Sequence, residues 1–217
     1  MIDFEAARRK MVDNQIRTRD VTAHSVLQAF LSVPREDFIP EKARSLAYID
    51  ADIEIAPGRY LMDPSPLAKL LQLAAISKSD AVLEIGAGSG YISALLGHLA
   101  GSVVAVESDE ALAAQAAQIL STVDLGNVKV VQGNMEAGYA SQAPYDVIFF
   151  DGSVEEVPTA IIEQLNDGGR LIAVVGHGNA AQATLMVREQ GLVSQSSHFN
   201  ASLKPLPVFR RAKEFVF

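Results

Sequence analysis

The stretch Val-Leu-Glu-Ile-Gly-Ala-Gly-Ser-Gly-Tyr, residues 82–91, decides the fold of this chain. It begins as an apolar run, places glycine at the alternate positions 86, 88 and 90, and continues into an apolar pattern of helical spacing. A strand, a glycine turn and a helix in that order let backbone amides approach a ligand that side chains would block. The dinucleotide fingerprint is G-x-G-x-x-G, and here the third glycine comes one residue too early for it.

Downstream of Asp80 the hydrophobic pattern alternates between strand-like and helix-like segments. Strands are predicted at 81–85, 102–106, 127–132, 145–150 and 169–175, and helices at 90–100, 109–121 and 155–165. This alternation predicts an α/β fold with a Rossmann-like, doubly wound and mostly parallel sheet covered on both faces. Residues 184–187 and 193–199, separated by Glu-Gln-Gly, predict a late antiparallel hairpin, with a helix over 180–189 as the alternative.

Residues 1–78 have a different pattern and predict an N-terminal helical extension packed on a core domain of residues 79–217. Helices are predicted at 4–18, 22–31 and 67–76, and a short helix is predicted at 41–48. Residues 49–63 are predicted to be irregular, and the proline-containing segment 204–217 predicts an edge strand or an extended tail.

Composition narrows the classes of partner. The net charge of −8 argues against duplex DNA or an anionic membrane as a partner. The chain has no cysteine, which excludes disulfides, zinc–thiolate sites and cysteine nucleophiles. The amino terminus lacks an apolar signal core, and no apolar run reaches the length of a membrane span. We therefore expect a cytoplasmic protein that binds neither nucleic acid nor membrane.

Ligands of open α/β sheets bind outside the carboxyl ends of the strands, so the residues that end each predicted strand are site candidates. The second strand ends at Glu107, whose carboxylate can accept hydrogen bonds from both hydroxyls of a ribose. A loop carboxylate on the surface is the alternative. The fourth strand ends at Asp151, which is a candidate for a place beside the reacting groups, for a metal ligand or for a helix cap. The histidines do not cluster in the sequence, and no metal site is predicted.

The G-x-G-x-G turn with Glu84 two residues upstream resembles motif I of the S-adenosylmethionine-dependent methyltransferases. The resemblance implies S-adenosylmethionine as the cofactor, with the adenine held by the segment after the third strand. Many members have Asp where this chain has Asn134, whose side-chain oxygen can still accept a hydrogen bond from the adenine amino group. The cofactor-binding residues expected on this basis are Glu84, Gly86, Ala87, Gly88, Ser89, Gly90, Glu107, Ser108, Gly133, Asn134, Met135 and Asp151.

Several further segments resemble the protein-L-isoaspartate O-methyltransferase family. Residues 9–17 contain M-V-x-x-Q-I of its amino-terminal helix, and residues 33–40, V-P-R-E-D-F-I-P, resemble its V-P-R-x-x-F-V-P element. Ala47-Tyr48 resembles its A-Y-x-D segment. The resemblance covers about residues 8–178 in the right order. It implies methylation of the free carboxylate of an isoaspartyl residue in a protein or peptide, the first step in the repair of damaged proteins.

The substrate loop departs from the family pattern G-x-T-I-S-x-P. Residues 58–64 read Gly-Arg-Tyr-Leu-Met-Asp-Pro, so that Tyr60 stands at the threonine position and Met62 at the serine position. Met62 cannot donate a hydrogen bond, and Asp63 puts a negative charge near an anionic acceptor unless Arg59 offsets it. The predicted substrate loop therefore consists of Arg59, Tyr60, Leu61, Met62 and Asp63.

This departure leaves three functions open. The first is a carboxyl O-methyltransferase of the isoaspartyl type. The second is a diverged methyltransferase on another acceptor, including a metal-dependent enzyme with Asp151 as a ligand. The third is a protein that binds S-adenosylmethionine without catalysis. The oligomeric state is not predicted.

Overall fold

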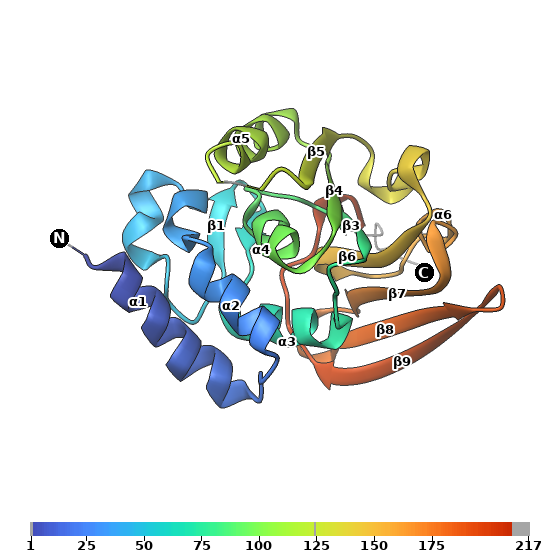
Figure 1. The fold of residues 1–217 in the computed structure, drawn as a ribbon, viewed down its shortest axis with the longest axis horizontal. Helices are drawn as coiled ribbons and strands as arrows, with labels where there is room; N and C mark the ends of the chain where they lie inside the picture. The colour runs from blue at the N-terminus through green and yellow to red at the C-terminus, as the bar shows by residue number, and fades with distance from the viewer. Residues whose placement is uncertain (1, 124, 210–217) are drawn as a thin grey trace, which may run out of the picture.

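The computed structural model describes residues 2–123 and 125–209. A central sheet stands between an N-terminal group of helices and a thinner layer on its opposite face (Figure 1). Within the described residues the strand order of this sheet is β5-β4-β3-β6-β7-β8-β9. Its strands are β3 (Ala81–Ile85), β4 (Ser102–Glu107), β5 (Val128–Gln132), β6 (Tyr145–Val154), β7 (Leu165–Val175), β8 (Gln182–Glu189) and β9 (Leu192–Asn200).

In the spatial order β5-β4-β3-β6-β7, each strand is parallel to the next. Strand β8 is antiparallel to both β7 and β9. This arrangement confirms the predicted doubly wound, mostly parallel sheet with a late antiparallel hairpin. From β3 the chain adds β4 and β5 on one side of the sheet and then β6 and β7 on the other, so the topological switch point lies between β3 and β6. The carboxyl ends of β3, β4 and β6 therefore meet at one edge of the sheet, beside this point.

Helices cover one face of the sheet more heavily than the other. The helices are α1 (Phe4–Met11), α2 (His24–Ser32), α3 (Pro64–Ala74), α4 (Tyr91–Leu99), α5 (Glu110–Leu120) and α6 (Thr159–Ile162). Residues 12–19 continue α1 as a π turn and a 3₁₀ turn, which confirms the helix predicted over 4–18. Side chains from α2, α3 and α4 pack on Val82 of β3, whereas the next residue, Leu83, belongs to the cluster on the opposite face with α6.

Two predicted segments are wrong in detail. Residues 49–63 are not wholly irregular, because β1 (Ile53–Ala56) and β2 (Arg59–Leu61) form an antiparallel hairpin. The helix predicted over 155–165 shrinks to the four residues of α6. Its start is fixed by Pro158 at the N-cap position, and its extension is prevented because Leu165 already pairs with Tyr145 in the sheet.

The end of the chain runs back over the sheet rather than forming an edge strand. Pro205 makes a single bridge to Ser153, and residues 207–209 form a 3₁₀ turn. This part is the extended alternative of the predicted tail, and residues 210–217 lie outside the described residues. In the described part of the chain, no helix is long and apolar enough to cross a membrane.

Candidate cofactor and acceptor site

The glycine turn, residues 86–90, joins β3 to α4 at the carboxyl edge of the sheet. Gly86, Gly88 and Gly90 have φ angles of 93°, 55° and 89°. Residues with a β-carbon rarely adopt these angles, so the backbone conformation itself requires the three glycines. The amide of Gly86 donates to the carbonyl of Val106 at 2.8 Å, which ties the turn to the end of β4.

Among the described residues, three buried polar side chains in β3, in the turn and in β6 have an oxygen without a hydrogen-bond partner. They are Glu84 through Oε1, Ser89 through Oγ and Asp151 through Oδ1. The other carboxylate oxygen of Glu84 accepts a hydrogen bond from Ser93 Oγ at 2.6 Å. Burial raises the pKa of Glu84 to about 8 and the pKa of Asp151 to about 7. Unpartnered oxygens beside the glycine turn fit a ligand that carries amino and hydroxyl donors, as S-adenosylmethionine does.

Glu107, at the end of β4, is fully buried and makes a bidentate ion pair with Arg59 of the β1–β2 hairpin. Arg59 Nη1 lies 2.6 Å from Oε1, and Nη2 lies 2.8 Å from Oε2. The amide of Gly88 donates to Oε2 at 2.9 Å, and the amide of Asp109 donates to Oε1 at 3.0 Å. Burial alone would raise the pKa of Glu107, but these bonds and the charge of Arg59 hold it below its ordinary value.

The remaining predicted cofactor residues lie at the same edge of the sheet. Ala87 and Met135 are buried, and Ser108 directly follows Glu107. The amide of Gly133 donates to the carbonyl of Glu107 at 2.9 Å, which holds the β5 turn beside β4. Asn134 is exposed, and its Oδ1 already accepts the amide of Glu136 at 2.9 Å as the cap of a 3₁₀ turn. The oxygen expected to meet the adenine is therefore engaged in this structure.

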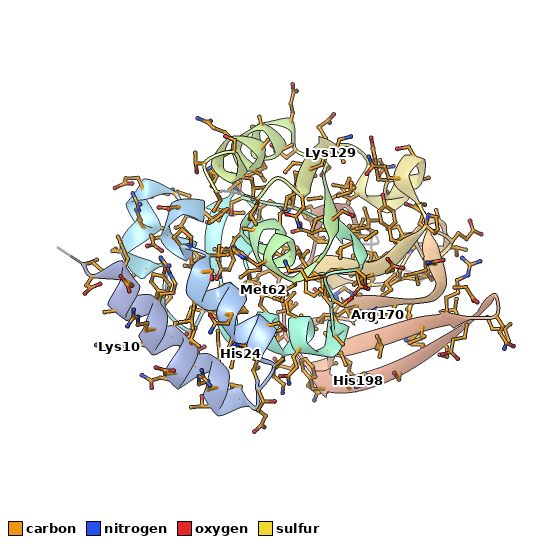
Figure 2. All side chains as sticks on the ribbon, viewed as in Figure 1. Lys10, His24, Met62, Lys129, Arg170 and His198 are labelled. Atoms are coloured by element: carbon orange, nitrogen blue, oxygen red, sulfur yellow. The ribbon has the colours of Figure 1, made fainter. Side chains whose placement is uncertain are left out.

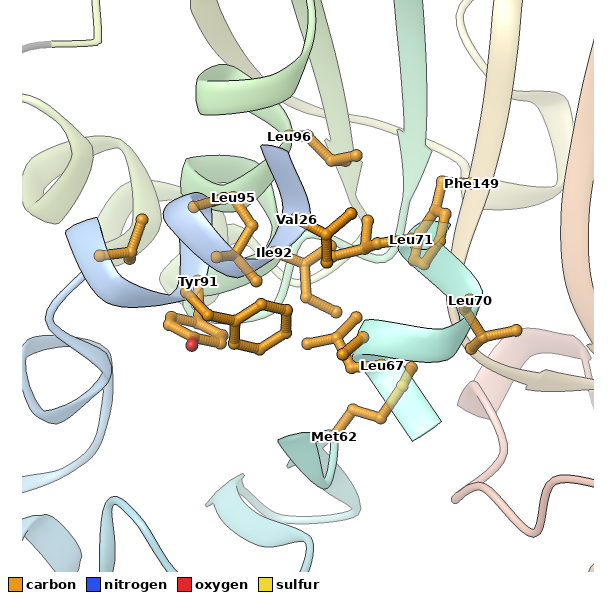
Figure 3. Close-up of a cluster of buried hydrophobic side chains, with 14 of the residues drawn as sticks. Val26, Met62, Leu67, Leu70, Leu71, Tyr91, Ile92, Leu95, Leu96 and Phe149 are labelled. Atoms are coloured by element: carbon orange, nitrogen blue, oxygen red, sulfur yellow. The ribbon is translucent and has the colours of Figure 1, made fainter. Parts of the chain in front are cut away.

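The predicted substrate loop divides between the core and a small cavity. Met62 is buried and lies beside Leu67 in the cluster between the helices and the sheet (Figure 3). Leu61 is buried in the same cluster. Asp63 caps α3 by accepting the amide of Ser65 at 2.9 Å. Burial, together with the neighbouring Asp50, raises the pKa of Asp63 to about 6.

A cavity of about 10 Å³ lies between the substrate loop and the end of β6. The side chains and backbone around it come from Asp52, Tyr60, Met62, Asp151, Gly152, Leu203 and Lys204. The ammonium group of Lys204 stands 5.3 Å from the centre of the Tyr60 ring. A volume of this size holds about one water molecule, so an acceptor enters beside Asp151 only if the surrounding side chains move.

Three residues of the site lay outside the sequence prediction. Arg35 is buried below the substrate loop, and it donates to the carbonyls of Ala47 and Met62 at 2.8 Å each. Its motif, V-P-R, was the only signal that marked it. Leu206 and Ile55 cover the glycine turn, and no motif in the sequence around either residue marked it as part of the site.

No cluster of three or more potential metal ligands occurs among the described side chains. His24 on α2 and His198 on β9 are on separate elements (Figure 2), and His177 pairs with Glu155 at 3.1 Å. The histidines therefore contribute no shared centre within the part of the chain that the structure describes.

The profile of the protein-L-isoaspartate(D-aspartate) O-methyltransferase family matches residues 6–207. The chain belongs to this family. It is 35% identical over 206 residues to protein-L-isoaspartate O-methyltransferase 2 of Anaeromyxobacter sp. (strain Fw109-5), covering 95% of this chain and 84% of that protein. It is 41% identical over 179 residues to protein-L-isoaspartate O-methyltransferase 1 of Rhodopseudomonas palustris (strain HaA2), covering 82% of this chain and 73% of that protein.

Solved structures agree with this membership. A protein-L-isoaspartate O-methyltransferase superposes with a TM-score of 0.80 at 26% identity, over 92% of this chain and 65% of the other. A putative member from Plasmodium falciparum, solved with S-adenosyl-L-homocysteine, superposes with a TM-score of 0.78 at 17% identity. It matches over 95% of this chain and 99% of its own. The family assignment and the predicted class of enzyme, an S-adenosylmethionine-dependent methyltransferase, are confirmed.

Proposed function

We propose that the chain methylates the free carboxylate of isoaspartyl residues in damaged proteins, with the methyl group supplied by S-adenosylmethionine. The observation that carries this proposal is the glycine turn with its unpartnered acceptors on Glu84, Ser89 and Asp151. These groups, together with Glu107, form an acceptor-rich crevice at the switch point of a family fold.

The chemistry asks little of the side chains beyond position and exclusion of water. Bound S-adenosylmethionine supplies an electrophilic methyl group, and a carboxylate acceptor is already ionised near neutral pH. The acceptor therefore needs no general base. The buried side chains of Met62 and Leu203 supply apolar surface beside Asp52 and Asp151 around the small cavity, which limits the access of water to the reacting groups.

The predicted cofactor contacts remain part of this proposal. Glu107 is the group placed to hold the ribose, and the glycine turn is the backbone surface against which the cofactor lies. Ala87, Ser108, Gly133, Asn134 and Met135 complete the same edge. Substrate-loop residues Tyr60 and Met62 would face the acceptor from across the small cavity.

A second candidate function is methylation of an acceptor that is not an anionic carboxylate. The observation that favours it is charge: Asp52 and Asp151 line the small cavity, and Asp63 lies next to Met62. An anionic acceptor is repelled by these groups unless a cation accompanies it. The same site would then accept a neutral or cationic group.

The two functions are distinguished by a pair of peptides of identical sequence, one with isoaspartate and one with aspartate. Transfer of labelled methyl from S-adenosylmethionine to the isoaspartyl peptide alone is the expected result. Labelling of neither peptide, with cofactor still bound in calorimetry, would leave the second candidate as the better account.

A glycine variant tests whether the turn is the cofactor surface. A β-carbon at Gly86 would lie 2.8 Å from Leu206 Cδ2 at a φ of +93°. Gly86→Ala should therefore lower both cofactor affinity and methyl transfer by ~10-fold or more. Gly168→Ala is the matched control, because its φ is +80° but the space around it is open. Equal effects of both variants would mean that strain alone, rather than the cofactor surface, explains the loss.

A further inference from the structure

The β1–β2 hairpin covers the glycine turn with two side chains. A β-carbon added at Gly88 would lie 3.1 Å from Ile55 Cδ1 and 3.7 Å from Arg59 Nη2. Arg59 Nη2 also donates to the carbonyl of Gly86 at 3.3 Å. The surface expected to receive the cofactor is thus in contact with the substrate loop in this structure.

The hydrogen-bonding capacity of Glu107 is fully used in this arrangement. An ionised carboxylate offers about four lone-pair positions. Two are taken by the Arg59 guanidinium and two by the amides of Gly88 and Asp109. The hydroxyls of a ribose can therefore bind the Glu107 carboxylate only after the Arg59 guanidinium has moved away from it.

A released Arg59 would not be far from the acceptor. The point at which a Gly88 β-carbon would stand is 3.7 Å from Arg59 Nη2 and 3.7 Å from Asp151 Oδ2. Asp151 lines the small cavity together with Tyr60 and Met62, the next residues along the substrate loop. The Arg59 guanidinium and the Asp151 carboxylate are therefore near neighbours, and the charge of Asp151 acts on Arg59.

The charge of the cavity gives the released cation a partner. With Asp52 and Asp151 around the cavity and no loop serine, an anionic acceptor needs a cation there. A guanidinium matches a carboxylate in a bidentate manner, as it already does with Glu107. Lys204 lines the cavity, but it is exposed to solvent and its ammonium group lies over the Tyr60 ring. Arg59 does not line the cavity, but it is buried, and a buried cation attracts a carboxylate more strongly than an exposed one does.

We propose that Arg59 alternates between two carboxylates. It occupies Glu107 until the ribose of the cofactor displaces it, and it then binds the carboxylate of the acceptor. Cofactor binding thereby prepares the acceptor site, and the cofactor binds first. The second half of this inference rests on the proposed isoaspartyl substrate, whereas the first half concerns the cofactor alone.

Two variants of Arg59 separate its effect on S-adenosylhomocysteine binding from its effect on peptide binding. Arg59→Gln removes the competitor, so the dissociation constant of S-adenosylhomocysteine measured by calorimetry should fall by about 10-fold. Binding of an isoaspartyl peptide to the protein saturated with S-adenosylhomocysteine should weaken by about 10-fold or more. Arg59→Lys keeps the charge but not the bidentate geometry, so it should tighten the first ligand while retaining most of the affinity for the second.

The control is Arg170→Gln, which removes an ion pair with Asp80 (2.7 Å) away from the site and should leave both affinities unchanged. Unchanged or weaker S-adenosylhomocysteine binding by Arg59→Gln overturns the competition with the cofactor. Unchanged peptide binding by that variant, or no peptide binding by the wild type, overturns the acceptor role. Failure of the proposed function has a separate signature, because wild-type protein would then fail to methylate the peptide whatever Arg59→Gln does to S-adenosylhomocysteine.

Discussion

Arg35 is a buried cation that no carboxylate pairs directly. Its Nε and Nη2 atoms donate to two loop carbonyls at 2.8 Å, and its guanidinium carbon lies 4.9 Å from the centre of the Tyr91 ring. Burial lowers the pKa of Arg35 below its ordinary value, despite the opposing effect of Tyr91. The residue therefore holds the end of the substrate loop, at the carbonyl of Met62, beside Tyr91 of α4.

Substitution of Arg35 tests this role. Arg35→Met leaves two buried carbonyls without donors, and the free energy of unfolding should fall by about 3 kcal/mol. Arg35→Lys can donate to one of these carbonyls, so its free energy of unfolding should lie between those of the wild type and Arg35→Met. Urea denaturation of both variants measures the loss, and Arg19→Gln, on an exposed arginine, serves as the control. A loss below about 1 kcal/mol in Arg35→Met would show that the loop holds its position without this side chain.

At the residue scale the sequence predicted which side chains reach the crevice but not how they pair. Glu107 was expected to be an acceptor for a ligand, and its partner Arg59 was expected to face a substrate. The two are 48 positions apart, and only the folded hairpin brings them together. Hydrophobic periodicity carries no information on such a contact, because it reports which face of an element is buried and not what lies opposite.

At the scale of elements, the long parallel strands were predictable and the short ones were not. The predicted strand 81–85 coincides with β3, because a run of apolar residues ends at glycine. The strands β1 and β2 have four and three residues, too few for an alternation to stand out beside Pro57 and Gly58. The hairpin that covers the glycine turn was therefore missed.

The amino terminus of α2 is capped by a side chain of α3. Its N-cap residue, Ala23, offers no side-chain acceptor. Instead Gln72 of α3 accepts the amides of Thr22 and Ala23 at 2.8 and 2.9 Å, and it donates to the carbonyl of Asp20 at 3.1 Å. A side chain 50 positions away thus performs the capping that the local sequence lacks.

Substitution of Gln72 should affect stability through this cap. Gln72→Ala leaves two amides at the helix start without their acceptor and should lower the free energy of unfolding by about 1 kcal/mol. Gln72→Glu keeps an acceptor and adds a negative charge at the helix amino terminus, so it should lose less. Thermal and urea unfolding rank the two variants. A larger loss in Gln72→Glu than in Gln72→Ala would contradict the capping role.

At the scale of the whole molecule, the N-terminal region and the sheet share one hydrophobic core. Buried residues of α2, among them Val26 and Phe30, belong to the same cluster as Val82 and Phe149 of the sheet. We propose on this basis that residues 1–78 are an extension packed on the methyltransferase core of residues 79–217, and not a unit that folds alone. The substrate loop lies at their junction, which is where an acceptor has to meet the cofactor.

Buried carboxyl groups should make the cofactor-free molecule less stable as the pH rises. The pKa values of Glu84, Asp151 and Asp63 are raised to about 8, 7 and 6, chiefly by burial. The folded state therefore retains protons that the unfolded chain has lost, and the stability present below the unfolded pKa values near 4 disappears as the pH rises toward 8.

Glu107 and Asp80 have lowered pKa values and are ionised in both states above pH 5, so they do not oppose this trend. His98, whose pKa burial lowers from 6.5, opposes it only below about pH 6.5. The free energy of unfolding, measured with urea, should decrease by roughly 5 kcal/mol between pH 5.5 and pH 8. Glu84→Gln should flatten this slope, whereas Glu163→Gln, on an exposed side chain, should leave it unchanged. A stability that is constant or rises over this interval would mean that water or the Arg59 guanidinium solvates these carboxylates, and that their unpartnered oxygens are not held for the donors of a ligand.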